Sequence, residues 1–382
     1  MFDYKIKLEI VQEGLNGETC WVQFRAGAIP PRKSDNPPQV VGVIQKLHLK
    51  GSDVFDGLNS LRNNDLGESW IGPTVEGAFK RQKLSDDMQI VVNDFTPKWH
   101  EKTGVLLGTG HNVRYKGFNI MPDPRPRDVT YGVYDESTKS WSSSKVLEFP
   151  DEERFFGVGA GSTQRVDLAD GTILLPVYFK RPGETEMSSM VVHCSFDGKT
   201  LEYIESGNEL SVNGGRGFGE PSLIEFAGRY FLTLRNDLDG YVCTSRDGLN
   251  FGKVKPWCFD DGESLGNYNT QQHWVKHGDQ SLYLIYTRRG ADNDNVFRHR
   301  APLFIAQVDP ETLCVIRDTE QVLVPNRGAR LGNFAVCETS DKEVWVTASE
   351  WMQTNLPDPF DYTVCQKYGS NNAVFIARII WE

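Results

Sequence analysis

The chain has 382 residues, of which 39% are hydrophobic and 24% are charged, and its formal net charge at pH 7 is −11. The composition is that of a globular protein, and no apolar run approaches the roughly 20 residues that a membrane helix needs, so we expect no membrane partner. The acidic balance also argues against a nucleic-acid partner, because phosphates would be repelled over most of the surface, but it leaves room for a local basic pocket.

The N-terminus, MFDYKIKLEIVQEG, has no basic start followed by an apolar block, which is the pattern of a secretory signal. We therefore expect a cytoplasmic protein, with secretion as the alternative if a leader precedes this sequence. The seven cysteines show no CxxC spacing, and their odd number favours buried free thiols over disulfides or a zinc site. Walker and Rossmann patterns are absent, so we expect neither a cofactor nor a metal.

Short runs rich in Val, Ile, Leu, Phe and Tyr recur along the chain with Gly, Asp and Asn between them, which is typical of an all-β protein. The runs repeat with a period of about 60 residues. The run KIKLEIV at 5–11 precedes the first unit and has no partner of its own. The expected paired strands are, in chain order, 21–29 with 39–47, 87–94 with 104–109, 155–168 with 172–179, 220–226 with 230–235, 271–276 with 281–287, and 333–338 with 343–349, followed by a third strand at 372–381.

Aspartate-containing turns follow several of these strands. They read RNNDLGESW at 62–70, SFDGKTLEY at 195–203 and TSRDGLNF at 244–251, with VYDESTKSW at 133–141 as a looser copy. Asp accepts backbone hydrogen bonds inside such a turn, Gly takes a positive φ, and the following large residue packs between sheets. We interpret these turns as folding elements.

The units together predict a single domain over residues 1–382, folded as a six-bladed β-propeller in which the N-terminal strand joins the last blade and closes the ring. A two-sheet sandwich with an extra domain is the alternative, but no Pro/Ser-rich linker divides the chain. In a propeller the starts of first strands and the ends of second strands meet near the axis. We therefore look for a ligand site at those positions.

The stretch GEPSLIEFAGRYFLTLRN at 219–236 shows this arrangement most clearly. With AGR as the turn of a hairpin, Glu220 and Arg235 become neighbours at the axial edge. Other residues expected at the same edge include Asp94, Tyr178 and Arg330. Arginines gathered at one edge of an acidic protein indicate an anionic ligand group, because the guanidinium fork matches a carboxylate.

Three features of the sequence are similar to the sialidase (neuraminidase) superfamily over nearly the whole chain: the aspartate turns, which look like SxDxGxTW boxes, FRAGAIP at 24–30, which looks like the FRIP motif, and GEPSLIEF…LTLR. The resemblance implies an arginine triad that holds the carboxylate of sialic acid, matched here by Arg25, Arg235 and Arg300. It also implies a glutamate that assists the nucleophile, matched by Glu220, and an acid/base aspartate, for which Asp53 is the nearest candidate.

The family's nucleophilic tyrosine opens the first strand of the sixth unit, where this chain reads RLGNFAV and has Asn333. Three routes remain open. Tyr268 attacks with help from Glu220, or Asp53, Glu220 or His273 activates water, or a uronic acid undergoes β-elimination with His or Tyr as the base.

The sequence thus predicts an exo-glycoside hydrolase of sialidase type that removes a terminal carboxylated sugar, sialic acid or a related nonulosonate, from an anionic glycan or small sugar. A lyase or another glycosidase acting on uronic-acid glycans, and a carbohydrate-binding propeller without activity, are the alternatives. The catalytic candidates are Glu220, Asp53, Tyr268, His273 and His48. The substrate-binding candidates are Arg25, Arg235, Arg300, His111, Gln272, Arg288 and Asn333.

Overall fold

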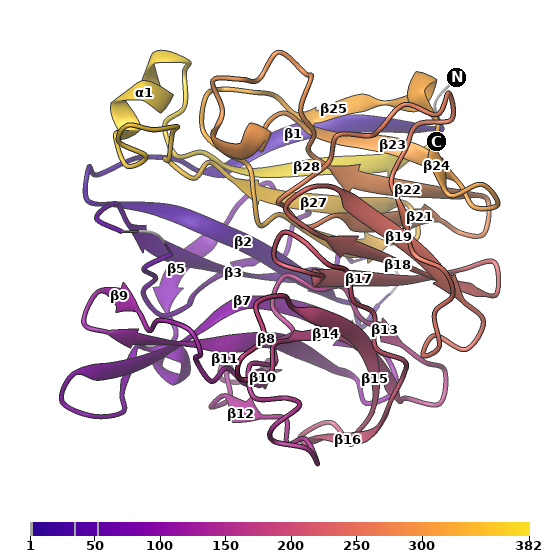
Figure 1. The fold of residues 1–382 in the computed structure, drawn as a ribbon. Coiled ribbons are helices and arrows are strands. Elements are labelled where there is room, and N and C mark those ends of the chain that lie inside the picture. Colours follow the sequence, from indigo (N-terminus) through magenta and orange to yellow (C-terminus); the bar gives the residue numbers. More distant parts are fainter. Residues whose placement is uncertain (1–2, 34–35, 52) are drawn as a thin grey trace.

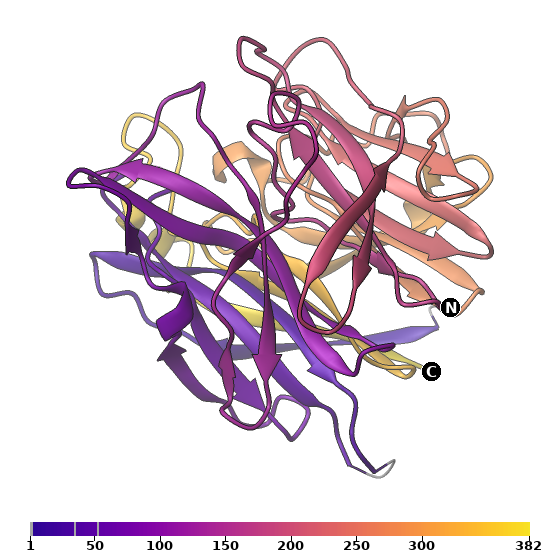
Figure 2. The same cartoon turned by 90° about the horizontal axis from the view of Figure 1, so that it is seen from below.

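The fold was analysed in a computed structural model that describes residues 3–33, 36–51 and 53–382. Position 52, in the stretch that follows the second expected strand, lies outside the described residues. Within these ranges the strands form six antiparallel sheets that are arranged in a propeller-like way. Seen from below, the indigo and purple strands of the first sheets and the rose strands of later sheets lie on opposite sides of the molecule (Figure 2).

The first three sheets take up the first half of the chain. The first sheet has the order β2-β3-β4-β5, with bounds Thr19–Ile29, Gln39–His48, Asn59–Asn63 and Ile71–Val75. The second follows the 3-10 helix η1 (Gly77–Phe79) and contains β6 (Gln82–Lys83), β7 (Met88–His100), β8 (Val105–Lys116), β9 (Asn119–Ile120), β10 (Val129–Asp135), β11 (Ser140–Trp141) and β12 (Lys145–Val146). The third has β13 (Val166–Asp167), β14 (Ile173–Phe179), β15 (Ser188–Phe196) and β16 (Leu201–Ser206).

The other three sheets follow in chain order. The fourth has β17 (Gly219–Phe226), β18 (Arg229–Arg235), β19 (Gly240–Ser245) and β20 (Lys255–Pro256). The fifth has β21 (His273–His277), β22 (Ser281–Tyr286), β23 (Leu303–Asp309), β24 (Cys314–Val315) and β25 (Gln321–Val324), with the 3-10 helices η2 (Phe297–His299) and η3 (Arg317–Thr319) between them. The last has β26 (Ala335–Ser340), β27 (Glu343–Ser349), β28 (Val374–Trp381) and β1 (Tyr4–Gln12), with helix α1 (Tyr362–Lys367) before β28.

The prediction of a six-bladed propeller is wrong. Five of the sheets follow a four-strand path, one of them with β25 added beside β23. The sheet built from β6 to β12 does not, because its path runs β6-β7-β8-β10-β11, with β9 paired to β8 and β12 paired to β10. The described residues therefore form five blades of the regular pattern and one irregular seven-stranded sheet.

The prediction that the N-terminal strand closes the ring is also corrected. β1 pairs with β28, from Tyr4 opposite Trp381 onward, and the two strands run side by side at the outer edge of the last sheet (Figure 1). Within the described ranges no strand of that sheet pairs with a strand of the first sheet. The two sheets meet through apolar side chains such as Phe24 and Trp345. The first and last sheets are therefore joined by side-chain packing and not by hydrogen bonds between strands.

The apolar residues of the strands are buried between neighbouring sheets, which explains their recurrence in the sequence. The aspartate turns have the expected local role: Asp247 Oδ1 accepts hydrogen bonds from the backbone N–H groups of Leu249 and Asn250, at 2.9 and 2.7 Å. The first strand of the third unit, expected at 155–168, is reduced to Val166–Asp167. No helix in the described part of the chain is long and apolar enough to span a membrane.

All seven cysteines are free thiols, and five of them are buried. The two that are partly exposed, Cys258 and Cys314, face each other with their Sγ atoms 3.1 Å apart.

Candidate active site

The inner edges of the sheets share an unusual backbone conformation. The non-glycine residues with positive φ include one within, or a few residues before, the strands β2, β7, β13, β17, β21 and β26: Gln23 (56°), Asp94 (53°), Ser162 (55°), Glu220 (43°), Asn269 (55°) and Asn333 (62°). In β2, β7 and β17 this residue lies where the strand pairing shifts register. Such bulges turn a side chain away from the regular pleat, and backbone strain of this kind is concentrated at functional sites.

A cavity of about 460 Å³ lies at this inner edge. Its walls are strongly cationic although the protein is acidic. Among the described residues, the lining carboxylates are Asp53, Asp94, Asp123 and Glu220. The lining cations are Arg114, Arg125, Arg127, Lys180, Arg181, Arg216, Arg235, Arg298, Arg300 and Arg330. Because basic residues outnumber acidic ones here, the cavity is suited to an anionic ligand.

Glu220 and Arg235 meet as the hairpin predicts. Gly219 of β17 lies opposite Arg235 of β18, and Arg235 Nη1 donates to Glu220 Oε1. Burial tends to raise the pKa of Glu220, but the charge and hydrogen bond of Arg235, with Arg216 and Arg300, outweigh burial and lower it. Glu220 is therefore a carboxylate at neutral pH. Its Oε2 is buried and has no hydrogen-bond partner among the described residues.

Two more arginines stand beside this pair. Arg300 follows η2, and its carbonyl oxygen accepts from the N–H of Leu331, 2.6 Å away, which ties it to the segment that carries Arg330. Burial, and then the charges of Arg235, Arg330 and Arg298, lower the pKa of Arg300 well below its usual range. Burial likewise lowers the pKa of Arg330 to about 9. In the described part of the chain, the Nε atoms of Arg300 and Arg330 have no partner.

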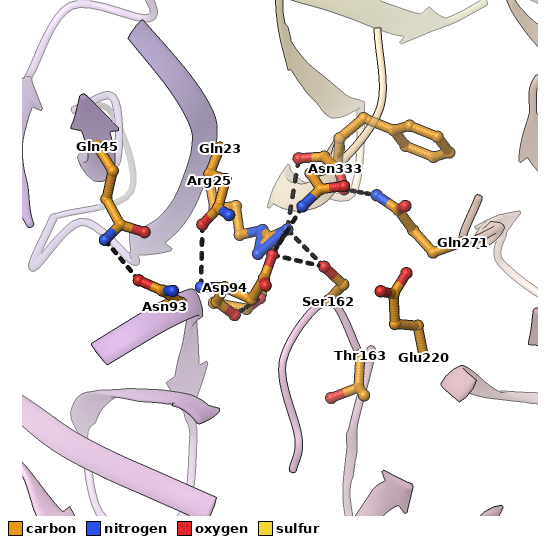
Figure 3. A network of polar contacts seen from close by, with 12 residues as sticks. Gln23, Arg25, Gln45, Asn93, Asp94, Ser162, Thr163, Glu220, Gln271 and Asn333 are labelled. Carbon is orange, nitrogen blue, oxygen red and sulfur yellow. Dashed lines mark hydrogen bonds and ion pairs between the residues drawn. The ribbon is translucent and has the colours of Figure 1, made fainter. Parts of the chain in front are cut away.

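Arg25, predicted to bind the substrate, lies in a fully buried position and is not in the cavity wall. Its Nη2 donates to Asp94 Oδ1 and to Ser162 Oγ, both at 2.8 Å, and Asn333 Nδ2 donates to the same Asp94 oxygen at 3.0 Å. These side chains converge on Asp94, and Glu220 lies beside the network (Figure 3). Arg25 therefore does not contact the cavity itself, and its hydrogen bond holds the carboxylate of Asp94 in position.

Among the described residues, the only tyrosine in the cavity wall is Tyr178, at the end of β14. Its Oη lies 3.4 Å from His111 Nδ1, and His111 Nε2 lies 3.8 Å from Asp94 Oδ2. Burial, with the charges of Arg127 and other arginines, holds the pKa of His111 well below its ordinary value, so the imidazole is neutral. The backbone at Gly161 approaches so closely that a Cβ there would lie 2.0 Å from His111 Nδ1. The three side chains form a chain from phenol to imidazole to carboxylate.

Two predicted site residues are buried behind the cavity. His273 Nε2 donates to the carbonyl oxygen of Phe334, 3.0 Å away, and its Nδ1 lies 2.8 Å from Ser222 Oγ. Burial lowers the pKa of His273 to about 3, so it stays neutral. Gln272 Oε1 accepts from Thr233 Oγ1 at 2.9 Å. Neither residue lines the cavity, because these hydrogen bonds turn both side chains into the packing between strands.

Two further candidates have partners elsewhere. The hydroxyl of Tyr268 bonds to His299 Nδ1, and neither residue is part of the cavity wall. His48 Nε2 lies 2.9 Å from Asp56 Oδ1, at the end of β3 and outside the cavity. The positions of Tyr268 and His48 therefore do not fit the catalytic roles expected of them.

Arg288 is also outside the cavity. It holds Glu320 with two hydrogen bonds, at 2.8 and 2.6 Å, and Tyr286 Oη donates to the same carboxylate at 2.6 Å. The ion pair with Glu320 accounts for the arginine at this position after β22, and no ligand is needed to explain it. By contrast, His111, Asn333 and Asp53 do line the cavity.

Asp53 stands near the arginine group. Its Oδ1 lies 3.9 Å from Arg330 Nη2, and Tyr115 Oη donates to its carbonyl oxygen at 2.9 Å. Two arginines of the cavity wall, Arg298 and Arg127, are not among the site residues predicted from the sequence. Arg298 lies two positions before Arg300, and Arg127 lies in the segment PRPRDV at 124–129. Arg298 could have been suspected because it lies close in sequence to Arg300. Arg127 could have been suspected because Arg and Pro cluster in its segment.

No protein-family model matches this chain, and no curated protein matches it. Solved structures do. A protein of unknown function from Dyadobacter fermentans aligns with a TM-score of 0.61 and 14% identity over 98% of this chain and 99% of its own. A Hadza microbial sialidase aligns with a TM-score of 0.57 and 13% identity over 93% of this chain and 65% of its own.

Two further solved structures are similar. The Trypanosoma rangeli sialidase aligns with a TM-score of 0.57 and 14% identity over 93% of this chain, which spans 55% of that enzyme. A leech intramolecular trans-sialidase aligns with a TM-score of 0.58 and 14% identity over 93% of this chain and 68% of its own. At such identities the likeness establishes a sialidase-like fold.

Proposed function

We propose that the protein binds a terminal carboxylated sugar, sialic acid or a related nonulosonate, and hydrolyses its glycosidic bond. The observation that carries this proposal is the group formed by Arg235, Arg300 and Arg330 beside Glu220 in one cavity. Arg330 takes the place in the triad that Arg25 was expected to fill.

Burying these arginines is unfavourable when no ligand is bound, and this favours the binding of a carboxylate. Arg300 and Arg330 are buried, the charge of Arg330 helps to lower the pKa of Arg300, and the charges of Arg298 and Arg235 help to lower that of Arg330. The Nε donors of both arginines have no partner among the described residues. Buried like charges are unfavourable unless a counter-ion satisfies them. A bidentate carboxylate supplies both the charge and the acceptors. Glu220 neutralises only part of this charge, because it pairs with Arg235.

Burial raises the pKa of the Tyr178 phenol, so in the proposed reaction its proton passes to His111 Nδ1, 3.4 Å away, in the same step as Tyr178 Oη attacks the anomeric carbon. A neutral nucleophile avoids repulsion by the substrate carboxylate. Asp53 donates a proton to the departing glycosidic oxygen as the carbon–oxygen bond breaks. Water then attacks the anomeric carbon and gives one proton to Asp53, the bond from the sugar to Tyr178 Oη breaks, and the proton held by His111 returns to the phenol oxygen. Glu220 stabilises the positive charge that develops on the sugar ring.

The experiment is incubation of the purified protein with sialosides of different linkage and measurement of released free sugar. We expect release by the wild type and a loss of about a hundredfold in kcat/KM for Arg300→Met, since a charge-assisted contact is worth about 1.5–3 kcal/mol. The proposal fails if no sialoside is cleaved. Binding without cleavage would instead identify a carbohydrate-binding protein.

A second candidate is a lyase acting on uronic-acid glycans, favoured by the pair of Tyr178 and neutral His111 beside the arginines. There an arginine neutralises the uronate carboxylate and the pair removes the proton from the carbon beside it. The bond to the leaving glycosidic oxygen breaks, and a carbon–carbon double bond forms without water being consumed. Ultraviolet absorbance from an unsaturated uronate product would select this reaction over hydrolysis.

A further inference from the structure

A second group of basic residues lines the same cavity on another side. Arg125 and Arg127 come from the segment between β9 and β10, and Lys180 directly follows β14. Arg235 instead ends β18 of the fourth sheet, Arg300 lies between η2 and β23, and Arg330 lies between β25 and β26. The second basic group therefore belongs to the wall that the second and third sheets build.

Two of these three cations contact one carboxylate, that of Asp123. Lys180 Nζ lies 2.6 Å from Asp123 Oδ2, and Arg125 Nε lies 3.5 Å from Asp123 Oδ1. Three positive charges against one negative charge leave a surplus of two. In a protein whose formal net charge is −11, such a local surplus on a cavity wall indicates an anionic partner.

Arg127 is held in place without a counter-ion of its own. Its guanidinium lies over the ring of Tyr178, 4.4 Å from the centroid, and Nη2 donates to the carbonyl oxygen of Gly157 at 2.7 Å. Its Nε is buried and has no partner among the described residues. Burial lowers the pKa of Arg127 and the charge of Arg125 adds to this, although the electrostatic effects of Tyr178, Glu220 and Asp123 oppose the shift. The side chain is therefore preorganised and its charge is incompletely satisfied.

We propose that Arg125, Arg127 and Lys180 form a subsite for a second anionic group of the same glycan, a sulfate ester or a second carboxylate. This inference rests on the proposed function, in which the first carboxylate lies on Arg235, Arg300 and Arg330. Tyr178 lies near both basic groups, since Arg127 packs on its ring and the charges of both Arg127 and Arg235 act on its hydroxyl. The reacting bond then lies between two anchored negative charges. The preferred substrate is a glycan with an anionic group on each side of that bond.

The test uses probes that resist hydrolysis, so that binding is measured apart from catalysis. The parent probe is an S-linked sialyl-galactoside. The first comparison probe carries a sulfate ester on its galactose, and the second carries a further sialic acid there, so that the two sources of negative charge are distinguished. Dissociation constants are measured by titration calorimetry. We expect at least one comparison probe to bind about tenfold more tightly than the parent, the gain typical of one charge-assisted contact.

Three variants separate the subsite from a general effect of charge. Arg125→Gln combined with Lys180→Gln is expected to abolish the tenfold preference and leave affinity for the parent probe within about twofold. Lys145→Gln combined with Lys199→Gln removes the same charge from exposed residues outside the cavity and is the matched control, which should keep the preference. Asp123→Asn removes the competing carboxylate and should increase the preference.

The outcomes are distinguishable. If the parent probe binds and neither comparison probe binds more tightly, the subsite is overturned and the proposed function stands. If the control pair reduces the preference as much as the Arg125 and Lys180 pair does, long-range charge explains it and the subsite is again overturned. If the parent probe does not bind at all, the proposed function has failed and the subsite fails with it.

Discussion

Replacing Arg330 by Met is expected to stabilise the free protein while it weakens ligand binding. The pKa of Arg330 is lowered to about 9 by burial. Against an ordinary value above 12, this corresponds to about 4–5 kcal/mol of unfavourable free energy for the charged form. The guanidinium recovers part of that cost by lying over the ring of Trp351, 4.0 Å from its centroid, a contact worth about 2 kcal/mol when desolvated. Asp53, half exposed and 3.9 Å away, adds little.

The net gain expected for Arg330→Met is thus about 2 kcal/mol, within the range seen when buried charges are replaced by apolar side chains. The unfolding entropy per residue, scaled to this chain length, turns that gain into a rise of about 2–3 °C in the melting temperature. Between pH 6 and 8 the guanidinium of Arg330 is charged in both the folded and the unfolded protein, so the full penalty applies over this range and the advantage of the variant should not change with pH there.

The assay is thermal unfolding by circular dichroism at pH 7, with and without a carboxylated sugar that stabilises the wild type. The variant should melt higher without ligand and gain much less from ligand. Arg288→Met is the matched control: it leaves Glu320 without its bidentate partner outside the cavity, so it should lower stability and keep the ligand effect. An Arg330→Met variant that melts lower than the wild type and is stabilised by the sugar as much would refute this reasoning.

Three other predictions follow from the contacts of the site and the thiol pair. Tyr178→Phe should keep the fold but lower kcat by about 10²–10⁴, and near-normal turnover would exclude Tyr178 from the reaction. Because Arg235 holds the pKa of Glu220 below its ordinary value despite burial, the carboxylate contributes stability above about pH 4.3 that is lost as pH falls through the lower folded pKa. Urea midpoints measured from pH 5 downward should therefore fall more steeply for wild type than for Glu220→Gln, and parallel curves would contradict this. Oxidised glutathione should join Cys258 and Cys314, whose Sγ atoms are 3.1 Å apart, as non-reducing peptide mapping would show; recovery of both free thiols would contradict it.

The hairpin that carries Glu220 and Arg235 could be predicted because a tight turn fixes its register, and register decides which residues meet at the strand ends. The same reasoning failed for His273 and Gln272. They lie at the start of β21, where side chains point to alternate sides, and hydrogen bonds inside the protein hold both of them away from the cavity. Strand ends can therefore be located from sequence more reliably than the direction of each side chain.

Other features of the site depend on contacts between distant segments. Asp94 and Ser162 meet Arg25 through the packing of three sheets, and the positive φ of Asp94 and Glu220 arises at bulges that carry no glycine signal. A regular ring of six blades is predicted because the same pattern of strands recurs in each unit of the sequence. The second sheet departs from it through the short strands β9, β11 and β12, whose two-residue lengths leave no periodic signal in the sequence.

The most direct test of the proposed function is a crystal structure of the protein with an unsaturated sialic acid analogue. We expect the carboxylate within hydrogen-bond distance of Arg235, Arg300 and Arg330, and the anomeric carbon facing Tyr178. A sugar bound outside this cavity, or a carboxylate that contacts none of the three arginines, would contradict the proposal.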